Sequence, residues 1–151
     1  MMLPIITHPN PILRQKAREL TREDILNPKF KKLMADMAET MLKKDGFGLA
    51  APQINQSIRL VTVNNNGEIA VFLNPKILKK SWRKNIAEEG CLSIPNVFLP
   101  IKRHSTITLE FLNLAGDKQI LKTKDLLARV LQHEIDHLDG ILFIDKAEKI
   151  N

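Results

Sequence analysis

The sequence predicts a single α+β domain in which antiparallel strands lie between N-terminal helices and a C-terminal helix. The order of the expected elements supports this fold, because helices come first, hairpin strands follow, and a helix ends the pattern. The chain has 151 residues, which suits one domain (1–151) built on one core. No repeat, low-complexity segment or linker is visible.

Two helices are expected in the first third of the chain. The stretch NPILRQKA (10–17) favours a short helix, with Asn10 as N-cap and Pro11 at the first position. Residues 27–44 favour a longer helix, which begins with the same Asn-Pro pair and ends at Asp45-Gly46. Its apolar residues recur at helical spacing, and its methionines are expected to fill the core: Phe30, Leu33, Met34, Met37 and Met41.

Two β-hairpins are expected next. The β-rich runs IRLVTV (58–63) and IAVFLNP (69–75) flank NNNGE, whose Asn-Gly is a turn signal. The alternating stretch STITLEFLN (105–113) is followed by AGDK and then QILKTK (119–124), which favours a second hairpin.

The last expected helix starts at Asp125, taken as its N-cap, and ends near Gly140, where a left-handed residue is favoured. The apolar and buried-type residues recur at helical spacing: Leu127, Val130, Leu131, Glu134, Ile135 and Leu138. This helix contains the stretch QHEIDHLDG (132–140).

The composition argues against several classes of protein. Hydrophobic content of 44% and charged content of 26% are ordinary, and no apolar run approaches the ~18 residues of a membrane span. The start MMLPIITHPNPILRQ resembles neither a signal peptide nor a transit peptide, so the cytoplasm is the expected location. The lone Cys91 excludes an intramolecular disulfide.

The net charge of +6 comes partly from the basic runs KFKK and KILKKSWRK. Such runs suit a polyanion such as ribosomal RNA, but they also occur on solvated surfaces. Because no RNA-binding signature is present, solvated faces are the expectation.

The spacing His-Glu-x-x-His at His133, Glu134 and His137 indicates a metal hydrolase. Residues four apart share a helix face, so both histidines can bind one ion while Glu134 reaches its water. This spacing arises by chance in about one chain of this length in a hundred, or fewer.

A catalytic metal site needs a third protein ligand. No histidine follows His137, and Glu148 is the only later glutamate. Upstream, Cys91 in EEGCLSIP offers a thiolate, a good ligand for iron or zinc. His8 and His104 are further candidates, but neither belongs to a recognisable constellation.

A third stretch, GFGLAAPQ (46–53), has small residues that permit a close backbone approach. Gln53 could place an amide donor in a cleft. The alternative is a plain loop after the helix, followed by a small-residue packing contact.

Taken together and in this order, GFGLAAPQ, EGCLS (89–93) and QHEIDHLDG resemble the three signatures of the peptide deformylases. Every specified position of those signatures is present, and the opening ITHPNPILRQKA is similar to the start of that family. The likeness covers nearly the whole chain. It implies antiparallel sheets packed around the helix that carries His-Glu-x-x-His.

The resemblance also implies an activity, which is removal of the formyl group from the N-terminal methionine of new bacterial polypeptides. Cys91, His133 and His137 would then hold a metal ion with water as the fourth ligand. Family members typically use Fe²⁺ and tolerate Zn²⁺, Ni²⁺ or Co²⁺.

The resemblance gives roles to three further groups. Glu134 would carry a proton from the attacking water to the leaving amine. The Gln53 amide and the backbone N–H of Leu92 would stabilise the oxyanion.

The expected substrate-binding residues are Gly48, Phe47, Leu126, Val130 and Glu89. Gly48 would meet the substrate backbone as in the family, and Glu89 is the motif residue beside the cysteine. Leu126 and Val130 share the helix face of the histidines, which suits a methionine pocket with Phe47 nearby. Leu126 and Val130 could equally be ordinary core.

Two features depart from many family members. The chain ends at LFIDKAEKIN, without the long basic C-terminal helix that some members use to dock on the ribosome. The segment SIPNVFLPIKR (93–103) is shorter than in many members. Asp136 is expected to pair with Arg103 or Lys102.

The expected partners are nascent formyl-Met polypeptides and, transiently, the ribosome surface, but neither DNA nor a membrane. The chain is expected to be a monomer. Two other functions remain open: a metallopeptidase that does not need Cys91, and a ribosome-associated module whose closed metal site takes His8 or His104 as a fourth ligand.

Overall fold

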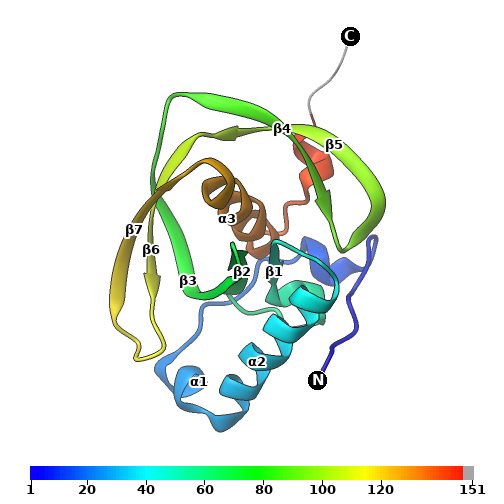
Figure 1. Ribbon diagram of the computed structural model, residues 1–151. Helices are drawn as coiled ribbons and strands as arrows, with labels where there is room; N and C mark the ends of the chain where they lie inside the picture. Colours follow the sequence, from blue (N-terminus) through cyan, green and yellow to red (C-terminus); the bar gives the residue numbers. More distant parts are fainter. Residues whose placement is uncertain (148–151) are drawn as a thin grey trace.

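The fold is arranged around helix α3 (Asp125–Leu138), which lies at the centre of the molecule and contacts both of its antiparallel sheets (Figure 1). The computed structural model describes residues 1–147. One sheet has five strands in the order β1-β2-β3-β6-β7, and the other consists of β4 and β5. The predicted α+β class, with sheets around the C-terminal helix, is confirmed.

The N-terminal helices follow the predicted capping pattern. The short 3-10 helix η1 (Pro11–Arg14) begins after Asn10, whose side chain accepts a hydrogen bond from the Ile12 N–H. Helix α2 (Pro28–Lys43) begins after Asn27, which caps it through the Lys29 N–H. Between them lies α1 (Arg22–Leu26), which was not predicted and which a Thr21–Asp24 capping box begins.

Both predicted hairpins are present. Strands β2 (Leu60–Asn65) and β3 (Glu68–Lys80) are antiparallel, and so are β6 (Thr106–Leu112) and β7 (Lys118–Lys124). Strand β3 runs five residues beyond its predicted end and pairs there with β6. The two hairpins thereby become one sheet.

Other parts of the architecture were also not predicted. The glycine-rich stretch forms strand β1 (Gly48–Ala50) and the 3-10 helix η2 (Ala51–Ile54) instead of a plain loop. Strands β4 (Lys84–Cys91) and β5 (Ile94–His104) form a long hairpin that curves over α3 (Figure 1). The last described element is η3 (Phe143–Lys146).

The ends of α3 confirm one prediction and correct another. Gly140 has φ +75, as expected after a helix, and a Cβ there would lie 2.5 Å from the Arg14 carbonyl oxygen. The predicted N-cap, Asp125, is wrong. Lys124 occupies the cap position without a side-chain cap, and Asp125 itself has φ +58. The abrupt turn from β7 into α3 requires that left-handed residue.

The core consists of side chains packed between α3, α2 and the five-stranded sheet. Met37 and Met41 are fully buried on α2, so their predicted role as core residues is confirmed. Leu131 and Leu138 of α3 pack with sheet residues such as Val61 and Leu109. No helix within residues 1–147 is long and apolar enough to span a membrane.

Candidate active site

Helix α3 brings both histidines of the His-Glu-x-x-His motif to one face. The ring centroids of His133 and His137 lie 5.1 Å apart, and both side chains are buried. Packing of Leu131 and Leu138 against the sheet fixes the rotation of α3, which turns the histidine face toward β4 and β5.

The β4–β5 hairpin supplies the third donor. Cys91 ends β4 after an irregularity in the pairing, and its Sγ lies 3.3 Å from His137 Nε2. The donor atoms of Cys91, His133 and His137 lie within 4.8 Å of one another. A thiolate and two imidazoles at this spacing fit one divalent transition metal, whose bonds to such donors are about 2.0–2.3 Å long.

Glu134 lies beside this cluster. Its Oε1 is 3.6 Å from His133 Nε2, while its buried Oε2 has no hydrogen-bond partner among the described residues. Burial raises the pKa of the Glu134 carboxyl to about 7. A carboxyl group with this pKa can accept and return a proton near neutral pH.

Glu89 anchors His133 from the opposite side. Its Oε1 lies 2.9 Å from His133 Nδ1, and since a carboxylate can only accept, Nδ1 carries the proton and Nε2 is left as the ligand atom. Two arginines also hold this carboxylate: Arg103 through Nε at 3.0 Å and Nη2 at 2.9 Å, and Arg129 through Nη1 at 2.5 Å. Burial alone raises the pKa of Glu89, but the hydrogen bonds from His133 and Arg103 outweigh it and hold the pKa at about 2.

The contacts of Glu89 add a role that the sequence did not predict. Glu89 borders the cavity, but both of its oxygens are occupied by Arg103, Arg129 and His133. It therefore orients a donor side chain, and its expected contact with substrate stays a prediction. Arg129 was missed in the sequence, although a charged residue inside the apolar run LLARVL was a signal for it.

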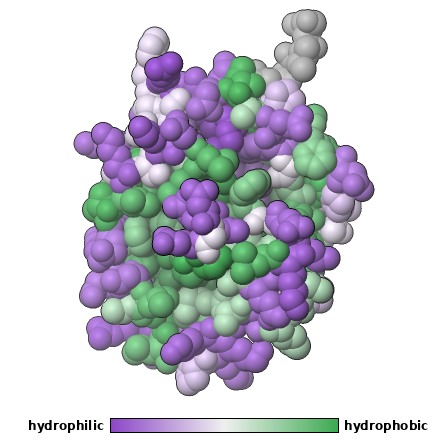
Figure 2. All heavy atoms as spheres, in the orientation of Figure 1, coloured by the Kyte–Doolittle hydropathy of each residue, from purple (hydrophilic) through white to green (hydrophobic). Residues whose placement is uncertain are grey.

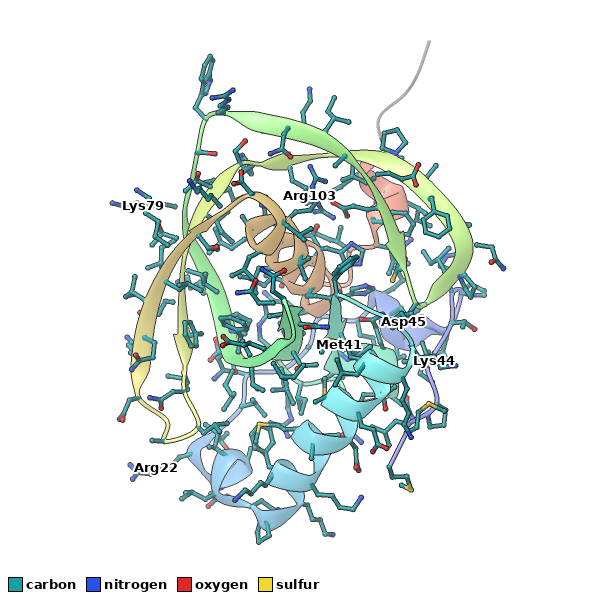
Figure 3. The ribbon with its side chains drawn as sticks, in the orientation of Figure 1. Arg22, Met41, Lys44, Asp45, Lys79 and Arg103 are labelled. Atoms are coloured by element: carbon teal, nitrogen blue, oxygen red, sulfur yellow. The ribbon has the colours of Figure 1, made fainter. Side chains whose placement is uncertain are left out.

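The predicted pairing of Asp136 is confirmed with Arg103. Arg103 Nη1 donates to Asp136 Oδ2 at 2.6 Å, and Lys146 Nζ lies 2.9 Å from the same oxygen. Arg103 points from β5 toward α3 (Figure 3). One guanidinium thus joins the helix to the carboxylate that holds His133.

Gln53 lies next to the cysteine. Its Oε1 accepts from the Ala50 N–H at 2.9 Å, and its Nε2 donates to Ser93 Oγ at 3.1 Å and lies 3.6 Å from Cys91 Sγ. The side chain is 1% exposed, so its amide is held rigidly at the cluster. The stretch is therefore more ordered than the plain loop of the alternative, although the small-residue packing contact that the alternative also named is present at Gly48.

A cavity of about 640 Å³ opens beside these groups. All the predicted site residues border it except His137, which lies behind them. Figure 2 shows apolar surface near the middle of the molecule, with hydrophilic side chains lying over part of it and around it. The mouth carries the exposed side chains of Phe47, Phe98 and Leu126.

Gly48 passes directly over Glu134. A Cβ at Gly48 would lie 2.8 Å from Glu134 Cγ and 3.0 Å from Val130 Cγ1. Only glycine allows β1 to approach α3 this closely. The close backbone approach predicted for the glycine stretch is therefore the approach of Gly48 in β1 to α3.

The remaining candidate ligands lie elsewhere. His104 Nδ1 lies 2.8 Å from the Ser81 carbonyl oxygen, and His8 is exposed. Neither joins the Cys91 cluster within residues 1–147, and Glu148 lies outside the described residues.

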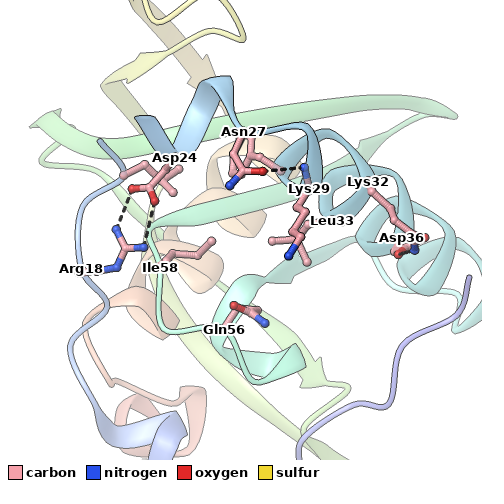
Figure 4. A pocket seen from close by; sticks show the side chains of 11 residues that line it. Arg18, Asp24, Asn27, Lys29, Lys32, Leu33, Asp36, Gln56 and Ile58 are labelled. Carbon is pink, nitrogen blue, oxygen red and sulfur yellow. Dashed lines mark hydrogen bonds and ion pairs between the residues drawn. The ribbon is translucent and has the colours of Figure 1, made fainter. Parts of the chain in front are cut away.

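A second cavity, of about 530 Å³, lies between α1, α2 and the segment around Ile58 (Figure 4). Four of its five charged groups pair with each other, Arg18 with Asp24 and Lys32 with Asp36. No cluster of potential metal ligands borders it within the described chain.

Comparison with known proteins agrees with this geometry. Residues 2–151 match the family model described as polypeptide deformylase. The chain is 46% identical over 136 residues to the peptide deformylase of Pseudothermotoga lettingae, covering 90% of this chain and 77% of that protein. It is 41% identical over 147 residues to that of Desulforudis audaxviator, covering 97% and 94%.

Solved structures show the same similarity. The peptide deformylase of Thermotoga maritima superposes with a TM-score of 0.94 at 36% identity, covering 99% of both chains. The actinonin-bound class I type b enzyme of Acinetobacter baumannii gives a TM-score of 0.93 at 33% identity, covering 98% and 99%. Sequence, fold and site agree, and the chain belongs to the polypeptide deformylase family.

Proposed function

We propose that this chain hydrolyses the formyl group from the N-terminal methionine of new polypeptides, with the methionine side chain in the 640 Å³ cavity. The observation that carries this proposal is the convergence of Cys91, His133 and His137 beside Glu134 at the wall of that cavity. A related enzyme from Acinetobacter baumannii, 31% identical to this chain, has been solved with Met-Ala-Ser bound. A peptide of this kind is what deformylation would leave.

Fe²⁺ is the ion that we propose for the Cys-His-His site, with Zn²⁺, Ni²⁺ or Co²⁺ as substitutes. All four ions accept a thiolate and imidazoles. A bound ion supplies Lewis acidity, which makes water a better nucleophile at neutral pH and polarises a carbonyl group. The contribution of this chain is to present the three donors, with His133 oriented by Glu89.

Glu134 carries the proton in this proposal. The attacking water loses a proton to the Glu134 carboxylate while its oxygen bonds to the formyl carbon. The C–N bond then breaks, Glu134 returns the proton to the leaving amine, and formate departs. The pKa of about 7 suits a group that must both take and give a proton.

Gln53 Nε2 and the Leu92 N–H would stabilise the negative oxygen that forms at the formyl carbon. Gln53 Nε2 lies 3.6 Å from Cys91 Sγ, and Leu92 follows Cys91 directly at the cavity wall. Removing one such donor typically raises the barrier by roughly 3 kcal/mol.

Substrate binding is assigned to the cavity wall. Gly48 is the part of β1 closest to Glu134, so its backbone is placed to meet the substrate main chain. Val130 and Leu126 of α3, with Phe47 at the mouth, would hold the methionine side chain.

The two alternatives are less well supported. A closed structural site needs a fourth protein ligand, and neither His8 nor His104 lies in the cluster. A metallopeptidase that does not use Cys91 does not explain why Cys91 Sγ lies 3.3 Å from His137 Nε2. We further propose that the chain acts as a monomeric cytoplasmic enzyme on polypeptides leaving the ribosome.

The test is formate release from formyl-Met-Ala-Ser by protein purified without oxygen and loaded with Fe²⁺. Glu134→Gln should abolish release while retaining metal, whereas Cys91→Ala should lose the metal itself. Glu110→Gln, on the outer face of β6, should match the wild type in both assays. Absence of formate from metal-loaded wild type would refute the proposal, and full metal retention by Cys91→Ala would refute the ligand assignment.

A further inference from the structure

Trp82 is the most exposed large apolar side chain of the described residues, with 98% of its surface accessible. It is the only tryptophan of the sequence and lies in the turn between β3 and β4. An indole on the surface of a domain this size is unusual, because tryptophan is normally highly buried. Its position calls for an explanation outside the core.

The turn that carries Trp82 is held firmly. Ser81 N donates to the Thr106 carbonyl at 2.9 Å, and Ser81 Oγ donates to the Arg83 carbonyl at 2.7 Å. Ser105 N donates to the same Arg83 carbonyl at 3.0 Å, and His104 Nδ1 lies 2.8 Å from the Ser81 carbonyl oxygen. The residues on both sides of the indole are therefore fixed, so Trp82 projects from a rigid support.

The turn is also strongly basic. The run KILKKSWRK (76–84) contains five cations and no acidic residue. Its cations are Lys76, Lys79, Lys80, Arg83 and Lys84. None of them forms an ion pair within residues 1–147, and Lys79 points outward from β3 (Figure 3). Hydrophilic side chains cover the corner where β3 passes into β4 (Figure 2).

The positive surface continues along the outer face of the five-stranded sheet. Thr108 on β6 pairs with Lys79 on β3 and with Lys122 on β7, so the two lysines flank it. In the next row toward the turn, Thr106 pairs with Lys124. The acidic groups nearby are Glu110, which pairs with Lys118 at 3.5 Å, and Asp125.

We propose that Trp82 and the cations around it bind single-stranded RNA. These cations are the five of the run 76–84 together with Lys122 and Lys124, and with Trp82 they are called the Trp82 surface. Sequence-tolerant RNA binding combines an aromatic side chain on which a base stacks with a row of cations that follows the phosphates. The Trp82 surface has both, on a rigid support that loses little entropy on binding. It does not border the catalytic cavity, so RNA and formyl peptide can be bound together.

An anionic membrane is the other polyanion that a basic, tryptophan-bearing surface can contact. The arrangement favours RNA, because the lysines do not stop at the turn around Trp82 but continue along rows of the sheet to Lys122 and Lys124. The distinction is experimental, since Trp82 is the only indole and tyrosine is absent, so protein emission reports on this residue.

The first experiment titrates the wild-type protein with a single-stranded RNA dodecamer at low salt. Base stacking should quench Trp82 emission, with an affinity that falls steeply as salt rises. Vesicles containing anionic lipid are added in parallel. A blue shift with vesicles and no response to RNA would overturn the proposal in favour of a membrane, and no response to either would overturn it outright.

The second experiment measures binding of a labelled RNA by anisotropy. Trp82→Ala should weaken binding about tenfold, within the range for one lost stacked base. Lys79→Gln with Lys122→Gln should lower the salt slope by about 1.4, since each phosphate contact contributes about 0.7. Lys16→Gln with Lys31→Gln, exposed and remote, removes the same charge and should change neither value.

Circular dichroism spectra and thermal melts of each variant show whether the fold is intact. Equal weakening by both lysine pairs would mean that only net charge matters and would contradict the assignment of the Trp82 surface. Unchanged RNA affinity in Trp82→Ala would contradict the stacking role. These results are independent of the deformylase assay, so either proposal can fail alone.

Discussion

Gln132 holds the backbone of His104 through both ends of its amide. Its Oε1 accepts from the His104 N–H at 3.1 Å and its Nε2 donates to the His104 carbonyl at 2.9 Å. Nε2 also donates to the Ala128 carbonyl at 2.9 Å. The residue before the first histidine of the motif thereby attaches α3 to β5, a role that its place in the sequence did not reveal.

Gln132→Ala should lower the free energy of unfolding by about 2–4 kcal/mol, because it removes three hydrogen bonds and leaves the partly buried His104 N–H and carbonyl without this partner. Urea denaturation measures the change. Gln119→Ala, an exposed residue bonded only to the adjacent Lys118 carbonyl, serves as the control and should change stability by less than about 0.5 kcal/mol. Equal changes in the free energy of unfolding for the two variants would show that the attachment of α3 to β5 does not stabilise the fold.

Glu89→Gln should weaken metal binding by roughly 10- to 100-fold, because His133 loses the anion that orients its ring. It should also destabilise the fold by about 3 kcal/mol, since Arg103 and Arg129 remain buried without their shared carboxylate. Competition with a chelator measures the first effect and denaturation the second. Glu88→Gln is the control, because Glu88 is exposed on the same strand, and a matching loss there would count against the proposed role.

Gly48→Ala should lower kcat/KM by roughly 10- to 100-fold with metal content unchanged, since the new methyl group displaces Glu134. Steady-state formate release and metal analysis separate these quantities. In Gly46→Ala the new Cβ would meet chiefly the flexible end of Leu92 at 3.1 Å, and a smaller effect is expected. Loss of metal from Gly48→Ala would indicate general disruption of the site instead.

Asp145 forms a salt bridge with Arg14, at 2.5 Å from Nη1 and 3.1 Å from Nη2, and this links η3 to η1. The hydrogen bonds from Arg14 hold the pKa of Asp145 below its ordinary value. A carboxyl with a lowered pKa stabilises the fold above its unfolded pKa of about 4, and this contribution is lost as pH falls further.

Asp145→Asn should therefore cost stability at pH 7, by less than about 1 kcal/mol because both partners are partly exposed. The difference from wild type should shrink as the pH falls below about 4, the ordinary pKa of an Asp carboxyl. Thermal melts across this range test the sign. Asp117→Asn, in the exposed β6–β7 turn, is the control. A stability difference between Asp145→Asn and wild type that grows as the pH falls would contradict the prediction.

The parts of the fold predicted from sequence are those with local signals. The two hairpins carry alternation and a glycine turn at Gly67 or Gly116, and α3 carries helical spacing between Leu127 and Leu138. The His-Glu-x-x-His spacing is local too, because one helix turn places both histidines. The family signatures then linked Cys91 to them.

The remaining parts depend on tertiary contacts. Strands β4 and β5 contain Gly90, Pro95 and Pro100 and show no alternation, so their pairing depends on packing over α3. Asp125 looked like a helix cap, but the exit from β7 places it at φ +58. The ion pairs of Glu89 with Arg103 and Arg129 join β4, β5 and α3, and no spacing rule predicts such a contact.

The distribution of the metal donors over β4 and α3 has a consequence for folding. Cys91 and His137 are 46 residues apart, so an ion held by both ties two distant segments together as a cross-link does. In the loop-entropy treatment used for disulfides, closing a loop of this size raises the free energy of the unfolded chain by roughly 4 kcal/mol. The bound metal ion would then stabilise the fold. Its removal by a chelator would weaken the attachment of the β4–β5 hairpin to α3 as well as end the hydrolytic activity.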